Sequence, residues 1–127
     1  MKKLVICDDE PHIVEGLRYL LRAPDRQILT ARNGQEAVDL VASHTPDLLI
    51  IDIMMPVMNG LDAVAAVRER EEFKDLPIII LTAKGQASIR DGSQHFLGAT
   101  VMPKPFEPKQ LRQFVAEILE SKISITQ

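Results

Sequence analysis

Hydrophobic positions along this chain follow two patterns, short apolar runs and apolar residues at helical spacing. The apolar runs at residues 4–7, 27–31, 48–51 and 78–81, with a weaker one at 100–102, predict five strands. The runs at 48–51 and 78–81 contain no alternating polar residues. Such runs are typical of strands that are buried on both faces of a parallel sheet.

The segments between the strands carry helical spacing. They predict helices over residues 11–21, 34–41, 61–72 and from 111 to about Ser121. Pro11 suits the first turn of the first helix, and Asn33 with Glu36 three residues later suits a capped start of the second. Segment 86–97 has few large apolar residues and contains Gly92, and we interpret it as a helix on this weaker pattern.

Five strands that alternate with helices predict an α/β fold, a doubly wound parallel sheet with helices on both faces. In such sheets ligands bind outside the carboxyl ends of the strands. The residues that follow each strand are therefore the first place to look for chemistry.

Composition narrows the classes of function. A chain of 127 residues with net charge −3 predicts one domain without the basic surface of a nucleic-acid-binding module. The single cysteine, Cys7, excludes an internal disulfide and a cysteine-rich zinc site, and it suits a reducing, cytoplasmic environment. No apolar run approaches the roughly 18 residues that span a bilayer. We therefore expect no direct contact with nucleic acid or membrane.

Four of the predicted strands are followed by polar residues that can act together. Asp8-Asp9-Glu10 follow the first strand, Asp52 the third, Thr82 the fourth and Lys104 the fifth. Each one alone is explained by a helix cap or a turn, and Asp9 or Glu10 suits the cap of the first helix. Their joint occurrence at successive strand ends instead favours a site in which carboxylates hold a hard cation such as Mg²⁺.

These residues resemble the receiver domain of two-component response regulators. The matching segments are Asp8-Asp9-Glu10, Asp52 to Gly60 (Asp-Ile-Met-Met-Pro-Val-Met-Asn-Gly), Thr82-Ala83-Lys84 and Lys104-Pro105-Phe106. The resemblance implies a flavodoxin-like sheet of order 2-1-3-4-5. It also implies a Mg²⁺-dependent switch that changes its docking surface when a sensor histidine kinase or phosphotransfer protein phosphorylates Asp52.

The resemblance also assigns roles to single residues. Asp52 would be the nucleophile, and Asp8, Asp9, Asp52 and the Met54 main-chain carbonyl would hold Mg²⁺. Lys104 would contact the phosphoryl group, and the Thr82 hydroxyl would turn toward it. In the turn after Asp52, Pro56 would fix φ and Gly60 would allow a positive φ.

Three residues depart from the common pattern of the family. Val101 stands where an aromatic residue is usual, and Phe96 or His95 could supply a ring, although Phe96 is better explained as a core residue. Pro103 predicts a short, frayed fifth strand at the sheet edge, where proline is tolerated. Met54 is apolar where many relatives are polar, and we expect it to obstruct the water that attacks the phosphoryl group.

Three other classes of protein share part of this pattern. A haloacid-dehalogenase-type phosphatase would need a second Asp two residues after the nucleophile, where Met54 stands. A flavodoxin-like cofactor carrier would need a phosphate-binding loop in place of Asp8-Asp9-Glu10. A degenerate receiver that acts only in docking or dimerisation would not need the intact set of site residues.

The predicted elements divide the chain into a receiver domain, residues 1–121, and a tail, residues 122–127. No residues are left for an output domain. We therefore expect the chain to act on a downstream protein or on an output domain outside this sequence, and formation of a homodimer stays open. It would have no enzymatic activity beyond its own phosphorylation and dephosphorylation.

Overall fold

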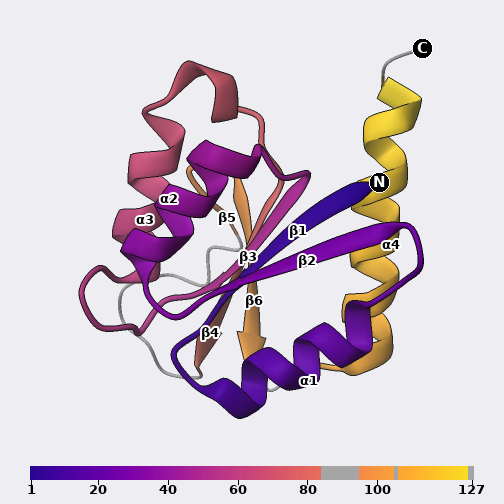
Figure 1. The fold of residues 1–127 in the computed structure, drawn as a ribbon, viewed down its shortest axis with the longest axis horizontal. Coiled ribbons are helices and arrows are strands. Elements are labelled where there is room, and N and C mark those ends of the chain that lie inside the picture. The colour runs from indigo at the N-terminus through magenta and orange to yellow at the C-terminus, as the bar shows by residue number, and fades with distance from the viewer. Residues whose placement is uncertain (84–94, 105, 126–127) are drawn as a thin grey trace.

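The computed structural model describes residues 1–83, 95–104 and 106–125 (Figure 1). Up to residue 83 its strands and helices alternate as the sequence pattern predicts. In chain order they are β1 (Lys2–Cys7), α1 (Pro11–Leu21), β2 (Arg26–Ala31), α2 (Gly34–His44), β3 (Leu48–Asp52), α3 (Gly60–Arg68), the 3₁₀ turn η1 (Glu71–Phe73), β4 (Ile78–Ala83), β5 (His95–Phe96), β6 (Ala99–Lys104) and α4 (Pro108–Ile125).

The strands form one sheet of order β2-β1-β3-β4-β6-β5. The first five of these pair in parallel, and β6 is the fifth parallel strand along the chain. The predicted doubly wound sheet of order 2-1-3-4-5 is therefore confirmed. Helices α2 and α3 cover one face, and α1 and α4 cover the other (Figure 1).

The sheet separates two hydrophobic cores. Val5 and Cys7 of β1 face the core under α2 and α3, whereas Leu4 and Ile6 face the core under α1 and α4. All five residues of β3 are buried. Since both faces of the central strands are covered by helices, neither face needs polar residues, which explains why these runs do not alternate.

The structure corrects the sequence prediction in its last third. The predicted helix over 86–97 lies mostly outside the described residues, and its end, His95–Phe96, forms β5 instead. Because β5 pairs antiparallel with Ala99 and Thr100, β6 is not the outermost strand. The prediction of a short, frayed β6 is also wrong, since the strand continues through Pro103 to Lys104.

The ends of two helices also differ from the prediction. Helix α3 ends at Arg68, and the charged residues after it form the turn η1. Helix α4 runs on to Ile125, beyond the predicted end near Ser121. None of the helices in the described part of the chain is long and apolar enough to cross a bilayer.

Arg68 ties the end of α3 to the loops around it. Its Nε donates to the Leu97 carbonyl at 2.8 Å, and its Nη1 donates to the carbonyls of Phe73 and Leu76, each at 2.8 Å. One guanidinium group thus satisfies three loop carbonyls, and it fixes the turn that leads into β6, the strand that carries Lys104.

Candidate functional site

The strand register aligns the predicted site residues at the carboxyl edge of the sheet. Cys7, the last residue of β1, lies opposite Ile51, and Asp52 at the end of β3 lies opposite Leu81. Lys104, the last residue of β6, lies opposite Ala83. Parallel strands in this register deliver the side chains that follow them to one edge, so residues far apart in sequence become neighbours.

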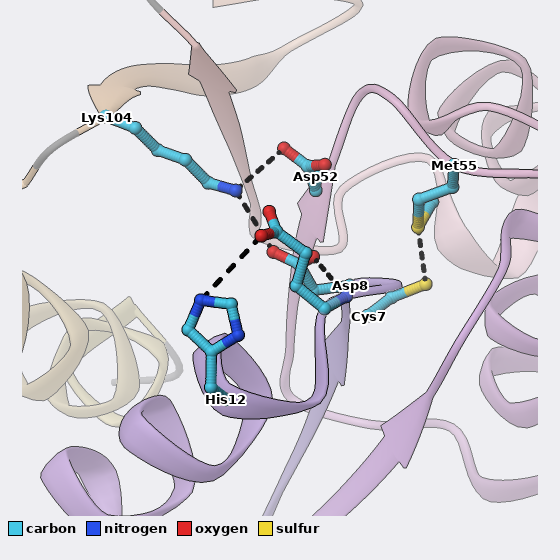
Figure 2. Close-up of polar contacts among 7 residues, drawn as sticks. Cys7, Asp8, His12, Asp52, Met55 and Lys104 are labelled. Atoms are coloured by element: carbon cyan, nitrogen blue, oxygen red, sulfur yellow. Dashed lines mark hydrogen bonds and ion pairs between the residues drawn. The ribbon is translucent and has the colours of Figure 1, made fainter.

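Lys104 joins the two acidic segments, Asp8-Asp9-Glu10 and Asp52. Its Nζ lies 3.1 Å from Oδ2 of Asp8 and 3.1 Å from Oδ1 of Asp52. Figure 2 shows the lysine side chain reaching from β6 to a point between the two carboxylates. The side chains of Asp8 and Asp52 are only 1% and 8% exposed, and that of Lys104 is 19% exposed. The arrangement is therefore a nearly buried cation shared by two buried carboxylates.

Burial and charge act against each other in this group. Burial raises the pKa of Asp52 above its ordinary value, with a further rise from Asp8, and the Lys104 hydrogen bond offsets only part of it. For Lys104, burial lowers the pKa, but the hydrogen bonds and charges of Asp8 and Asp52 outweigh burial and leave the pKa raised. Lys104 is thus held in its charged form by two carboxylates that repel each other.

The acidic segment after β1 forms a compact group of possible oxygen ligands. One carboxylate oxygen from each of Asp8, Asp9 and Glu10 lies within 4.8 Å of the others, and Asp9 and Glu10 are exposed. Asp52 is outside this group and is connected to it through Lys104. Glu10 was not among the predicted ligands. Its position directly after Asp8 and Asp9 in the sequence could have indicated that its carboxylate lies in the same group.

Asp8 is fixed by the backbone around it. Its N–H donates to the Ala31 carbonyl at 3.1 Å, and its Oδ1 accepts from the Glu10 N–H at 3.0 Å. Glu10 occupies the position before α1, but its side chain makes no cap hydrogen bond, while Pro11 starts the helix as predicted. The Glu10 carboxylate therefore does not cap the helix, and its Oε2 lies 3.7 Å from Nε2 of His12 instead.

Two glycines determine the path of the turn that follows Asp52. The Gly60 N–H donates to the Ile53 carbonyl at 2.8 Å, and a Cβ at Gly60 would lie 2.1 Å from the Asp52 carbonyl oxygen. The Gly34 N–H donates to the Met58 carbonyl at 2.9 Å, and a Cβ there would lie 2.3 Å from that oxygen. Both glycines are needed because backbones approach each other closely, not for a special φ.

The residue with a positive φ in this turn is Val57. The prediction that Gly60 would have the positive φ is therefore wrong. Val57 has φ 68°, and the Met58 N–H donates to the Pro56 carbonyl at 2.7 Å across it. A tight three-residue turn of this kind is strained, especially for a β-branched residue. The side chain of Val57 is 81% exposed, so the strained conformation is imposed by the backbone contacts and not by packing of the side chain.

Met54 and Thr82 lie at the same edge in different surroundings. The side chain of Met54, two residues after Asp52, is 63% exposed, whereas Met55 and Met58 pack against the core. Thr82 is half-buried near the end of β4. It directly follows Leu81, the residue that lies opposite Asp52. Phe96, in β5, packs against the same core as Val101, which confirms its interpretation as a core residue.

Cys7 lies directly before Asp8 and is buried, as expected for a small core residue. Its Sγ lies 3.3 Å from Sδ of Met55 (Figure 2) and 3.2 Å from the Asn33 carbonyl oxygen. Burial, then the charges of neighbouring carboxylates, raise the pKa of this thiol far above its ordinary value. The thiol is therefore protonated and unreactive at neutral pH.

The raised pKa of Asp52 gives a prediction for stability. A carboxyl whose pKa is higher in the folded than in the unfolded state destabilises the fold above that pKa, and the penalty vanishes as the pH falls toward the unfolded value. Asp52→Asn is therefore expected to raise the melting temperature at pH 7 in magnesium-free buffer, by an amount that shrinks on acidification. Thermal melts from pH 7 to pH 4 would measure it.

The matched control for this prediction is Asp25→Asn, which removes an exposed carboxylate far from the site. It should leave the melting temperature nearly unchanged at every pH. A stabilisation by Asp52→Asn that persisted at acid pH would show that its cause is not the ionised carboxylate.

Fold and site together define a class of protein: doubly wound α/β domains with a lysine-bridged acidic cluster at the carboxyl edge of the sheet. Comparison with known families makes the assignment specific. Residues 4–116 match the family described as the response regulator receiver domain, and the chain belongs to this family of two-component systems.

Individual relatives agree with this assignment. The chain is 36% identical over 122 residues to the sensor histidine kinase TmoS of Ectopseudomonas mendocina, covering 96% of the chain but 12% of TmoS. It is 34% identical over 117 residues to the response regulator Rre1 of a Synechocystis strain, covering 91% of the chain and 51% of Rre1. The chain therefore spans at most about half the length of these relatives.

A solved structure shows the same similarity. A response regulator structure from Chloroflexus aurantiacus is 33% identical, with a TM-score of 0.78 over 94% of this chain and 98% of that one. The fold is therefore that of receiver domains along nearly the whole sequence. Receiver domains interact with sensor histidine kinases and with output domains.

Proposed function

We propose that this chain is a phosphorylation-dependent switch in which Asp52 accepts a phosphoryl group from a sensor histidine kinase or a phosphotransfer protein. The observation that carries the proposal is the Lys104 Nζ, 3.1 Å from carboxylate oxygens of both Asp8 and Asp52. A purely structural cluster would gain little from this geometry, since two buried carboxylates and one lysine cost more to desolvate than apolar residues of the same size.

The donor set fits Mg²⁺. Carboxylate oxygens of Asp8, Asp9 and Glu10 lie within 4.8 Å of one another, and two of the three side chains are exposed to solvent. Mg²⁺ prefers a few carboxylates together with waters and phosphate oxygens. We assign Asp8, Asp9 and Asp52 with the Met54 main-chain carbonyl as its ligands, and Glu10 is a neighbouring carboxylate. When bound, the ion would neutralise charge on the phosphoryl oxygens.

The residues of the chain would act in the following way. A carboxylate oxygen of Asp52 attacks phosphorus in line, the new O–P bond forms, and the P–N bond of the phosphohistidine breaks. Lys104 then exchanges part of its contact with Asp52 for a phosphoryl oxygen and holds it as a point charge. The Thr82 hydroxyl donates to another phosphoryl oxygen, which moves the end of β4.

Phosphorylation replaces the single negative charge of the Asp52 carboxylate by a phosphoryl group that carries roughly 1.5 to 2 negative charges, beside the lysine that Asp52 shares with Asp8. This change is large enough to drive the new contacts of Lys104 and Thr82 and to alter the adjacent surface. We propose that a downstream protein, or an output domain outside this sequence, responds to that surface in the cytoplasm. Homodimerisation is a further route to the same response.

The test is phosphotransfer from a panel of purified, radiolabelled histidine kinases to the wild-type chain and to Asp52→Ala. We expect rapid transfer from a small subset of kinases to the wild type and none to the variant. Absence of transfer from every kinase, together with no labelling by a small phosphodonor, would identify a receiver that acts only in docking.

The exposed side chain of Met54 gives a prediction for the lifetime of the phosphoryl group. Met54 is 63% exposed, two residues after Asp52, where it can obstruct the attacking water. Met54→Asn removes the apolar obstacle and adds groups that orient water, so we expect dephosphorylation about tenfold faster, a change of about 1.4 kcal/mol in the barrier. Loss of the acid-stable, base-labile radioactivity bound to the chain over time measures the rate.

Val57→Asn is the control for this prediction, because Val57 lies in the same turn and is also exposed. Its substitution should leave the rate within about twofold of the wild type, a barrier change of less than about 0.5 kcal/mol. Equal rates for wild type and Met54→Asn would contradict the proposed role of Met54.

A further inference from the structure

Tyr19 is an aromatic residue that belongs to neither hydrophobic core. The chain has one tyrosine and four phenylalanines. Phe73 is buried and the other phenylalanines pack against the two cores, whereas Tyr19 is 71% exposed on α1. Tyrosine is enriched at protein–protein interfaces relative to the rest of the protein surface.

Tyr19 lines a groove between α1 and β2 together with three arginines. The lining residues are Glu15, Arg18, Tyr19, Arg22, Arg26 and Ile28, and the groove has a volume of about 320 Å³. We call it the α1/β2 groove. Ile28 also packs against the core under α1, which gives the groove an apolar floor beneath its charged walls.

The charge of the α1/β2 groove is only partly neutralised. Arg18 Nη1 pairs with Glu15 Oε1 at 3.0 Å, and Arg26 Nη1 donates to the Leu21 carbonyl at 2.7 Å. The Arg22 guanidinium lies over the Tyr19 ring, 4.5 Å from its centroid. Among the described residues, neither Arg22 nor Arg26 has a carboxylate within salt-bridge distance. The groove is therefore positive on a chain of net charge −3.

The groove lies away from the phosphoacceptor site. Helix α1 begins beside Asp8 at the carboxyl edge of the sheet and runs toward the opposite edge (Figure 1). Arg26 is the first residue of β2, opposite Lys2 at the start of β1. The groove is therefore separate from the group formed by Asp8, Asp52 and Lys104.

We propose that the α1/β2 groove binds an acidic segment of a partner protein, independently of the phosphorylation of Asp52. Guanidinium groups pair with carboxylates in bidentate geometry, and Arg22 is already ordered by the Tyr19 ring. Arginine and tyrosine are also the residue types that carry most binding energy at protein interfaces. Nucleic acid is a poorer occupant, because Glu15 lies in the groove and the chain as a whole is acidic.

The probe is a synthetic helical peptide with glutamates along one face and leucines beside them, titrated into the ¹⁵N-labelled chain. We expect saturable shifts confined to the groove residues, weaker binding at higher salt, and no binding of a peptide with glutamine at every glutamate position. Affinity should be equal with and without beryllium fluoride and Mg²⁺, which mimic the phosphorylated state.

Arg22→Glu and Tyr19→Ala should each weaken binding at least about tenfold, as expected for interface residues of these types. Both positions are exposed, and thermal melts verify that the variants fold. Arg112→Glu, at an exposed arginine on α4, should change nothing. Equal binding of the glutamine peptide, or unchanged affinity in Arg22→Glu, would overturn the proposal.

Two other occupants would also overturn the proposal. Shifts at the groove residues that grow with protein concentration alone would identify a second copy of this chain, whose own acidic residues Glu71 and Glu72 are exposed. Tighter binding of a single-stranded oligonucleotide than of the acidic peptide would identify a nucleic-acid site. None of these outcomes depends on phosphotransfer to Asp52.

Discussion

Replacing Lys104 by methionine is expected to lower the free energy of unfolding of the magnesium-free protein by about 3 kcal/mol. The substitution leaves Asp8 and Asp52, whose side chains are 1% and 8% exposed, without the cation that they share. The loss should be smaller at acid pH, where the carboxylates become protonated, and Mg²⁺ should restore part of it. Urea denaturation followed by circular dichroism measures these differences.

Lys109→Met, at an exposed lysine on α4, is the control and should change stability by less than about 0.5 kcal/mol. The two substitutions remove the same charge from the chain, so net charge cannot explain a difference between them. Similar small losses for both would mean that the bridge between Asp8 and Asp52 is not a strong interaction. Lys104→Met should also slow acceptance of the phosphoryl group, since it removes a charge from the transition state.

Gly60→Ala is expected to destabilise the protein by about 3 kcal/mol, at the upper end of the cost of overpacking. The new Cβ would lie 2.1 Å from the Asp52 carbonyl oxygen and 2.9 Å from Cα of Ile53, both backbone atoms that cannot move independently. The turn after Asp52 would have to open, which would also displace Asp52. Chemical denaturation gives the stability, and the rate of labelling by acetyl phosphate gives the effect on the site.

Gly16→Ala is the matched control, because it makes the same chemical change in the exposed middle of α1. A Cβ at Gly16 meets nothing within 4 Å. It should therefore stabilise the protein by roughly 0.5–1 kcal/mol through helix propensity. If Gly60→Ala were tolerated as well as Gly16→Ala, the close approach of the two backbones would not constrain the turn.

The sequence predicted the fold best where one physical signal dominated. Uninterrupted apolar runs identified β3 and β4, whose neighbours cover both faces, and helical spacing identified α1 and α4. Asn33 was recognised as a helix cap because its side chain has one local partner, the Glu36 N–H, which it binds at 2.9 Å. Such features depend on contacts within a few residues.

Features set by contacts distant in sequence were missed. Strand β5 has only two residues, too few to show any periodicity. It forms because the chain turns back on itself at Leu97 (φ 49°) and Gly98 (φ 80°), directly after the strand. A two-residue turn with two positive φ values favours a hairpin. The hydrogen bond that holds this turn comes from Arg68, 29 residues earlier in the chain.

The same difference between local contacts and contacts distant in sequence applies to the candidate site. The residues at the strand ends were identified from sequence, and the structure brings Asp8, Asp52 and Lys104 together as expected. The strained φ of Val57 was not predicted, because it is imposed by the contacts of the turn with Gly34 and Gly60. Glycine alone signals either a positive φ or a close approach, and only the structure distinguishes the two.

The central claim, that Asp52 accepts a phosphoryl group, is tested most directly by intact-mass analysis after incubation with acetyl phosphate. The account predicts that the wild type gains the mass of one phosphoryl group, only when Mg²⁺ is present, and that peptide mapping after reduction of the acyl phosphate places it on Asp52. Asp52→Asn should gain none. No mass increase in the wild type, or an equal increase in Asp52→Asn, would contradict the account.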